Sequence, residues 1–232
     1  DCRRLHIITP SRWLGEEAAR SPLVARFSRS VIANGMDMAA FAPRSRAAVR
    51  ESLGIPSDTR VVLFTANTLS IRRKGAALLL EALRGLTGVP GLLLLTIGGE
   101  SLPNAGNLPV RHMGYLCDER LLATVMTAAD VFAITSLEDN LPNTVLEAMG
   151  CGLPVVGFRV GGIPDMVRPD ENGLLVEKGD TAALQEALAR LLREDDLRAR
   201  LSAGARRIAV REYDMAHQAK ACVDLYERLL AE

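Results

Sequence analysis

Apolar runs alternate with amphipathic segments along most of this chain. Four mainly apolar runs predict buried strands, at residues 60–66, 91–97, 130–135 and 154–158. Shorter apolar strands are expected at residues 5–9, 110–113 and 174–176. Gly-Gly and Asn-Gly pairs follow several of these runs and mark turns.

Helical periods occupy the segments between the strands. Helices are expected over residues 74–86, 119–129 and Asn143–Gly150, and another begins near Ile163. Asp180 can cap a helix whose leucines recur at helical spacing, namely Leu184, Leu188, Leu191 and Leu192. A final helix over residues 213–230 carries one apolar row, formed by Ala216, Ala219, Val223, Tyr226 and Leu230.

The alternation of strand and helix predicts the fold class. Parallel strands joined by helices need a helical layer on each face of the sheet. We therefore expect an α/β protein with a doubly wound, Rossmann-like parallel sheet. Near the N-terminus, Ser11 is expected to cap a helix over Arg12–Arg20.

Composition narrows the function classes. The 28 basic and 28 acidic residues balance, so nothing predicts bulk attraction to nucleic acid or to an anionic membrane. Four scattered cysteines and three separated histidines predict neither a zinc site nor a disulfide framework. No run approaches the roughly 20 apolar residues of a membrane-spanning helix, and we find no signal peptide.

The segment from residue 135 to 165 holds the candidate chemistry. An acidic, Asn-rich loop follows the strand at residues 130–135. Its Asp139 and the later Glu147 form a pair of acids with seven residues between them. Open α/β sheets bind ligands at the carboxyl ends of their strands. Both carboxylates can therefore face one ligand that is rich in hydroxyl groups.

The ordered motif resembles the family-4 retaining glycosyltransferases, also called glycosyl transferases group 1, which have the two-domain GT-B fold. The resemblance lies in Ser136, Asp139, Leu146-Glu147-Ala148-Met149, Gly152-Leu153-Pro154-Val155-Val156 and Gly161-Gly162. The chain departs from the family at its first acid, which is Asp139 rather than Glu. It also has Asn140-Leu141-Pro142 where many members have a Gly-Phe-Gly-like turn.

The resemblance implies a domain plan and an activity. Residues 1–43 would end an N-terminal acceptor domain and form the linker, residues 44–212 would bind the nucleotide-sugar, and residues 213–232 would cross back. We expect an excised C-terminal half of a GT-B enzyme, since the chain begins at Asp1 without Met. The fragment should bind donor but be inactive alone.

The expected reaction transfers a sugar from a nucleotide-sugar donor, such as a UDP- or GDP-sugar, with retention of the anomeric configuration. No metal is expected. The acceptor would be a sugar or a lipid-linked molecule held by the absent domain. Polysaccharide biosynthesis in the cytoplasm is implied, with peripheral membrane association of the full-length protein as a further option.

The resemblance also assigns residues. Glu147 would accept hydrogen bonds from the ribose hydroxyls, and Lys74 would contact the diphosphate. Family members usually have an arginine nearer the strand end, where this chain has Ala66-Asn67; that Arg72 or Arg73 takes its place is our inference and not a motif match. The donor sugar would lie against Asp139, Asn140, Leu141, Pro142, Asn143 and Thr144. Backbone at Gly114 would read the base, and Gly161 and Gly162 would approach the ligand.

Simpler interpretations remain for each feature. Glu147 can be a solvated helix residue, Lys74 can belong to a solvated basic loop, and the Asp139 loop and the glycines can be ordinary turns. For the whole chain the alternatives are a sugar-nucleotide epimerase or phosphorylase of the same architecture, or a non-catalytic nucleotide-binding module. A dinucleotide site and a P-loop are disfavoured because their glycine motifs are absent.

Overall fold

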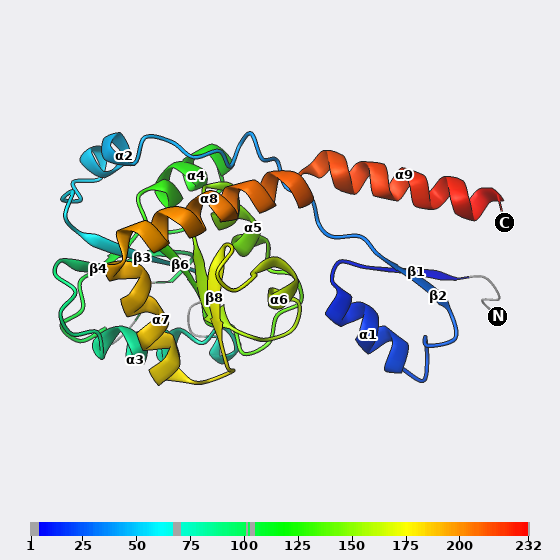
Figure 1. Ribbon diagram of the computed structural model, residues 1–232, viewed down its shortest axis with the longest axis horizontal. Coiled ribbons are helices and arrows are strands. Elements are labelled where there is room, and N and C mark those ends of the chain that lie inside the picture. The colour runs from blue at the N-terminus through cyan, green and yellow to red at the C-terminus, as the bar shows by residue number, and fades with distance from the viewer. Residues whose placement is uncertain (1–4, 67–70, 101, 103–104, 232) are drawn as a thin grey trace.

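The computed structural model describes residues 5–66, 71–100, 102 and 105–231. Its body is a six-stranded sheet in which every strand pair is parallel, with the order β5-β4-β3-β6-β7-β8 (Figure 1). The strands are β3 (Arg60–Thr65), β4 (Leu92–Ile97), β5 (Val110–His112), β6 (Val131–Ile134), β7 (Val155–Phe158) and β8 (Gly173–Val176). The predicted doubly wound parallel sheet is confirmed.

Helices cover both faces of this sheet. On one face α3 (Ala76–Arg84) packs against α7 (Thr181–Arg193). On the other, α4 (Glu119–Thr127) lies between α2 (Arg46–Ser52) and α5 (Asn143–Gly150). The remaining helices of the body are the short α6 (Ile163–Met166) and the long α8 (Asp195–Glu212), which packs on α5 and α7. Among the described residues, no helix is long and apolar enough to cross a membrane.

Predicted and observed helices differ where backbone conformation or tertiary contacts determine whether a helix forms and where it begins. The helix expected over residues 74–86 begins only at Ala76, because Gly75 adopts a left-handed conformation that ends the turn η1 (Arg72–Lys74). The helix α8 was not predicted, since charged residues surround its narrow apolar stripe. That stripe is buried in the body and consists of Leu197, Leu201, Ala205, Ile208 and Ala209.

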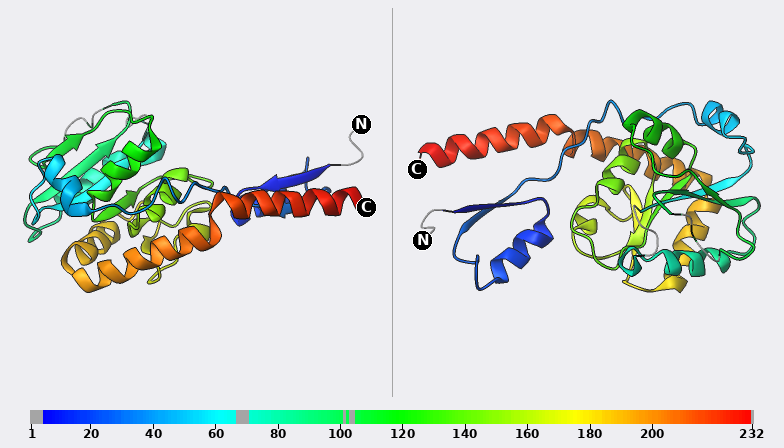
Figure 2. Two further views of the ribbon diagram at one scale, coloured as in Figure 1. Left: turned by 90° about the horizontal axis from the view of Figure 1, so that it is seen from above. Right: turned by 180° about the vertical axis from the view of Figure 1, so that it is seen from behind.

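A small second unit precedes the body. β1 (His6–Thr9) and β2 (Ser28–Val31) pair in parallel around α1 (Arg12–Arg20), which Ser11 caps by accepting a hydrogen bond from the Leu14 amide. Helix α9 (Met215–Ala231) leaves the body and lies beside this unit (Figures 1 and 2). The contact includes a hydrogen bond from Arg228 to Ser30, whereas the apolar row predicted on α9 is exposed.

Candidate functional site

A cavity of about 560 Å³ lies at the carboxyl ends of β3 and β4. The strand order reverses between β3 and β6, and such a reversal opens a crevice for ligands in doubly wound sheets. The cavity is lined by Thr65, Ala66, Ile71, Arg73, Lys74, Ile97, Gly98, Tyr115, Leu116, Cys117, Leu122, Thr144 and Glu147. Of the predicted site residues, Arg73, Lys74, Thr144 and Glu147 are in this lining.

The basic side of the cavity comes from η1, which follows β3. Gly75 has φ 69°, and a Cβ there would lie 1.9 Å from the carbonyl oxygen of Thr135. Only glycine therefore lets this turn cross so close to the end of β6. Two hydrogen bonds fix the crossing: the Leu137 amide donates to the Arg73 carbonyl at 2.7 Å, and the Thr135 hydroxyl donates to the Lys74 carbonyl at 3.1 Å.

Lys74 and Asp139 form an ion pair at the edge of the cavity. Lys74 Nζ lies 2.8 Å from Asp139 Oδ2, and the hydroxyl of Ser136 donates to the same oxygen at 3.1 Å. Arg73 donates to the Glu138 carbonyl at 2.9 Å and lines the cavity. Arg72 is exposed and does not line it. Of the two candidate arginines, Arg73 thus lines the cavity together with Lys74, and Arg72 does not.

Glu147 lines the same cavity from helix α5, one turn after Thr144. Burial raises the pKa of Glu147 from 4.5 to about 7, and the negative charge of Glu119 adds to this rise. Among the described residues its carboxyl group has no hydrogen-bond or ion-pair partner. Nearby, the buried hydroxyl of Thr65 also finds no partner in the described part of the chain. Both groups are available to a polar ligand.

The glycine pair after β7 contacts the acidic loop rather than the cavity. Gly161 has φ 53°, and a Cβ there would lie 1.7 Å from the Asp139 carbonyl oxygen. The Gly162 amide donates to that oxygen at 3.2 Å. The Asn140 side chain accepts from the Ser11 hydroxyl at 2.5 Å. The predicted residues that do not line the cavity are Arg72, Gly114, Asp139, Asn140, Leu141, Pro142, Asn143, Gly161 and Gly162.

The segment after β5 contributes lining residues that the sequence analysis missed. Gly114 accepts a hydrogen bond from the Gly98 amide at 3.0 Å, and Tyr115, Leu116 and Cys117 follow it along the cavity. These residues directly follow a predicted strand, so the rule that ligands lie at carboxyl ends of strands could have found them. Asn67, considered as a strand-end position, lies outside the described residues.

No metal cluster or disulfide is present in the described part of the chain. There, no three His, Cys, Asp or Glu side chains gather to hold an ion, and Cys117, Cys151 and Cys222 are free thiols. Cys151 is buried, which raises the pKa of its thiol to about 12.

Sequence relatives point to one family. Residues 59–194 match the family described as Glycosyl transferases group 1. D-inositol 3-phosphate glycosyltransferase of Xylanimonas cellulosilytica is 33% identical over 214 residues, which cover 84% of this chain and 50% of the relative. The same-named protein of Saccharomonospora viridis is 34% identical, with 86% and 50% covered. The chain spans about half the length of these curated relatives.

Solved structures agree in fold. Sucrose-phosphate synthase from Thermosynechococcus elongatus superposes with a TM-score of 0.84 at 28% identity, covering 97% of this chain and 58% of that one. Anabaena HepE in complex with UDP gives a TM-score of 0.80 at 22% identity, with 95% and 63% covered, and is similar in fold alone. This chain belongs to the group 1 glycosyl transferases, and its six-stranded body has the fold of the C-terminal domain of a GT-B enzyme.

Proposed function

We propose that the cavity lined by Lys74 and Glu147 binds the nucleoside diphosphate of a nucleotide-sugar donor. We further propose that the whole enzyme transfers the sugar with retention of the anomeric configuration. The observation that carries this proposal is that one cavity, at the switch point of the sheet, is lined by two cations and one unpaired carboxyl group. A nucleoside diphosphate has matching parts: an anionic diphosphate and a ribose with two vicinal hydroxyls. Support also comes from Anabaena HepE, a relative in fold that was solved with UDP.

Glu147 suits a ribose contact for two reasons. Its two oxygens can accept from two neighbouring hydroxyls, and hydrogen bonds to a charged acceptor are stronger than neutral ones. A vicinal diol would also replace the solvation that burial has removed from the ionised form. We therefore expect bound nucleotide to lower the pKa of Glu147 and to release a proton when it binds near pH 6–7, which lies around the free value of about 7.

Lys74 and Arg73 suit the leaving group. Negative charge grows on the diphosphate as the sugar departs, and fixed cations in a partly dry site stabilise such charge. The ion pair with Asp139 holds the ammonium of Lys74 at the edge of the cavity before donor arrives. Asp139 and the loop after it, next to the cavity, would then face the sugar, and an acceptor would approach from the N-terminal half of the whole protein.

Calorimetric titration of this chain with UDP, GDP and NAD in parallel tests the proposal. We expect saturable binding of one diphosphonucleoside and none of NAD. The titration is repeated near pH 6.5 in buffers of different ionisation enthalpy, which measures the protons released on binding. The Glu147→Gln variant should release only the protons that come from the nucleotide itself. The parent chain should release more, because Glu147 also loses its proton. Binding of NAD alone, or of none of the three, would contradict the proposal.

A further inference from the structure

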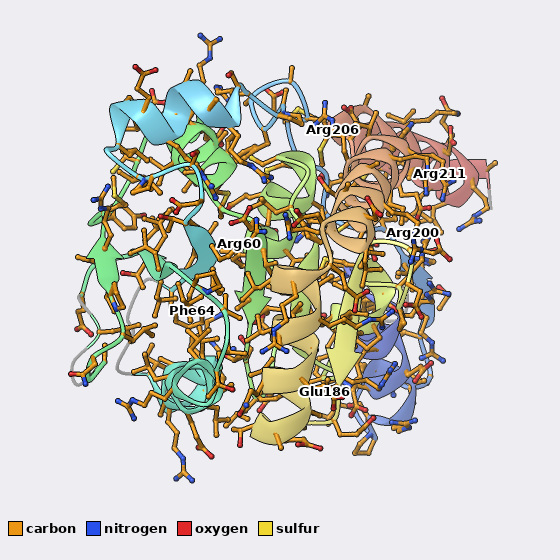
Figure 3. All side chains as sticks on the ribbon, turned by 60° about the vertical axis from the view of Figure 1, so that its left-hand side comes forward. Arg60, Phe64, Glu186, Arg200, Arg206 and Arg211 are labelled. Carbon is orange, nitrogen blue, oxygen red and sulfur yellow. The ribbon has the colours of Figure 1, made fainter. Side chains whose placement is uncertain are left out.

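A second cavity, of about 460 Å³, lies away from the proposed donor site and is rich in arginine. It lies among the linker that enters the body, the C-terminal end of α5 and helix α8. Four arginines and one acid line it, namely Arg44, Arg46, Arg198, Arg206 and Asp195. Figure 3 shows Arg206 on α8 near the linker, whereas Arg200 lies on the other side of the same helix. Because the whole chain is neutral, this is a local concentration of positive charge.

Two of these guanidinium groups keep unused donors. Arg206 directs Nη1 alone to backbone, donating to the carbonyls of Met38 at 3.0 Å, Phe41 at 3.2 Å and Gly150 at 2.9 Å. Arg46 donates from Nη1 to Asp130 Oδ1 at 3.0 Å. Among the described residues, the Nε and Nη2 groups of both arginines make no hydrogen bond. A guanidinium group has five N–H donors, so each retains a fork that can bind an anion.

The nearby carboxylates are already bonded to arginines: Asp130 pairs with both Arg46 and Arg50, and Asp195 pairs with Arg198. Asp130 accepts from Arg50 at 2.8 Å, and Asp195 accepts from Arg198 at 2.6 Å. Burial lowers the pKa of Arg46, Asp130 opposes this, and the positive charges of Arg50 and Arg198 lower it further. The like charges therefore repel one another, and a bound anion would relieve that repulsion.

We propose that this arginine cavity binds a small phosphate-bearing anion at a site separate from the donor site. Its volume falls within the roughly 300–1,000 Å³ of small-molecule sites, and arginine forks match the geometry of phosphate oxygens. Apolar wall is present as well, from Pro43, Cys151 and Ala199, which suits an organic phosphate better than a bare ion. Because Cys151 follows α5 directly, the occupant contacts the end of the helix that carries Glu147.

The test is calorimetric titration of inorganic pyrophosphate into the Lys74→Ala chain. This substitution is used because it weakens pyrophosphate binding at the proposed donor site. Ionic strength is held constant with chloride, because screening changes any interaction of exposed charges. Arg46→Gln is the main variant, since Asp130 keeps its bond to Arg50. Arg46→Lys keeps the charge and loses the fork, and Arg200→Gln removes an equal charge from the exposed side of α8.

We expect pyrophosphate to bind the Lys74→Ala chain and Arg46→Gln to weaken that binding by about tenfold or more, the scale of a charged hydrogen bond. Arg46→Lys should give an intermediate loss, and Arg200→Gln should stay within about twofold of the parent. Thermal unfolding confirms that each variant is folded. The proposal is overturned if the Lys74→Ala chain gives no binding heat, if both Arg46 variants bind like the parent, or if Arg200→Gln weakens binding equally.

Discussion

The loop after β6 and the helix α5 each carry one carboxyl group of the motif, and the two groups have different surroundings. Asp139, in the loop, accepts from Lys74 at 2.8 Å and from the Ser136 hydroxyl at 3.1 Å. Glu147, on the helix, has no partner among the described residues, and burial followed by the charge of Glu119 raises its pKa to about 7. One carboxylate is paired with a cation, whereas the other has no partner among the described residues and has a raised pKa.

This difference gives the two acids separate tasks, although they belong to one motif. Asp139 is committed to an ion pair, so its first effect is to hold the ammonium of Lys74 in place. Glu147 keeps both oxygens free, and it gains most when a ligand supplies hydrogen bonds to its ionised form. Substituting one residue of the site at a time should therefore affect turnover, stability and nucleotide binding to different extents.

The largest effect is expected for Lys74→Ala in the full-length enzyme. If Lys74 stabilises charge that grows on the departing diphosphate, its loss lowers kcat more than it weakens donor binding. We expect kcat to fall by about 10²–10³, comparable with removing one donor from an oxyanion hole. Steady-state kinetics with separate kcat and KM values would measure this.

Two neighbouring arginines supply the controls for Lys74. Arg73→Ala should lower kcat by a smaller factor, because Arg73 lines the cavity. Arg72→Ala should leave kcat near normal, because Arg72 lies outside the lining. If Lys74→Ala raises KM and leaves kcat intact, Lys74 contributes uniform binding and its role in the transition state must be given up.

The next effect is on stability, and it depends on pH. Since the folded-state pKa of Glu147, about 7, exceeds its ordinary 4.5, the folded protein holds a proton that the unfolded chain has lost between these values. The free energy of unfolding should therefore fall as pH rises from about 4.5 to 7. Glu147→Gln abolishes this loss, so its stability advantage should grow across that range to at most about 3 kcal/mol.

Denaturant unfolding at several pH values measures that advantage. Glu119→Gln serves as the comparison, because Glu119 is the smaller cause of the raised pKa. It should recover only part of the stability that Glu147→Gln recovers. An advantage of Glu147→Gln that stays constant between pH 4.5 and 8 would show that Glu147 is not perturbed in the folded protein.

Much of the body could be predicted from the sequence because its signals are local. Buried parallel strands are apolar runs, and the structure has β3, β4, β6 and β7 within one residue of the predicted ends. The helix Asn143–Gly150 was predicted with its observed bounds, since a strand and a Gly-Leu-Pro turn confine it. The strand-end rule and the family motif together pointed to Lys74 and Glu147, and both residues line one cavity.

Other features depend on distant contacts that the sequence does not display. Gly75 is required by the carbonyl of Thr135, sixty residues later in the chain. Gly161 looked like a ligand-binding glycine, but its nearest neighbour is the backbone of Asp139. The charge of Glu119 acts on Glu147 only after α4 and α5 pack together. Such pairs become visible only when the fold brings them together.

Nucleotide affinity should depend more on Glu147, the helix acid, than on Asp139, the loop acid. Glu147→Ala should weaken binding of the preferred nucleoside diphosphate by about 1–3 kcal/mol, the scale of hydrogen bonds to a charged group. Asp139→Ala should weaken it less, because its carboxylate is bonded to Lys74 rather than lining the cavity. Calorimetry on folded variants measures both affinities. An unchanged affinity for Glu147→Ala would contradict the proposed contact between Glu147 and the ribose.

The smallest effect is expected for Ser136→Ala. The buried hydroxyl of Ser136 supports Asp139, but Lys74 still bonds the same oxygen in the variant, so the carboxylate is not left alone. We expect a loss of about 1 kcal/mol in the free energy of unfolding and a fall in kcat of less than about tenfold. Ser52→Ala, which removes a hydroxyl bonded to the Val49 carbonyl on α2, should leave kcat unchanged. A fall in kcat for Ser136→Ala as large as for Lys74→Ala would mean that the hydroxyl, rather than the ion pair, fixes the loop.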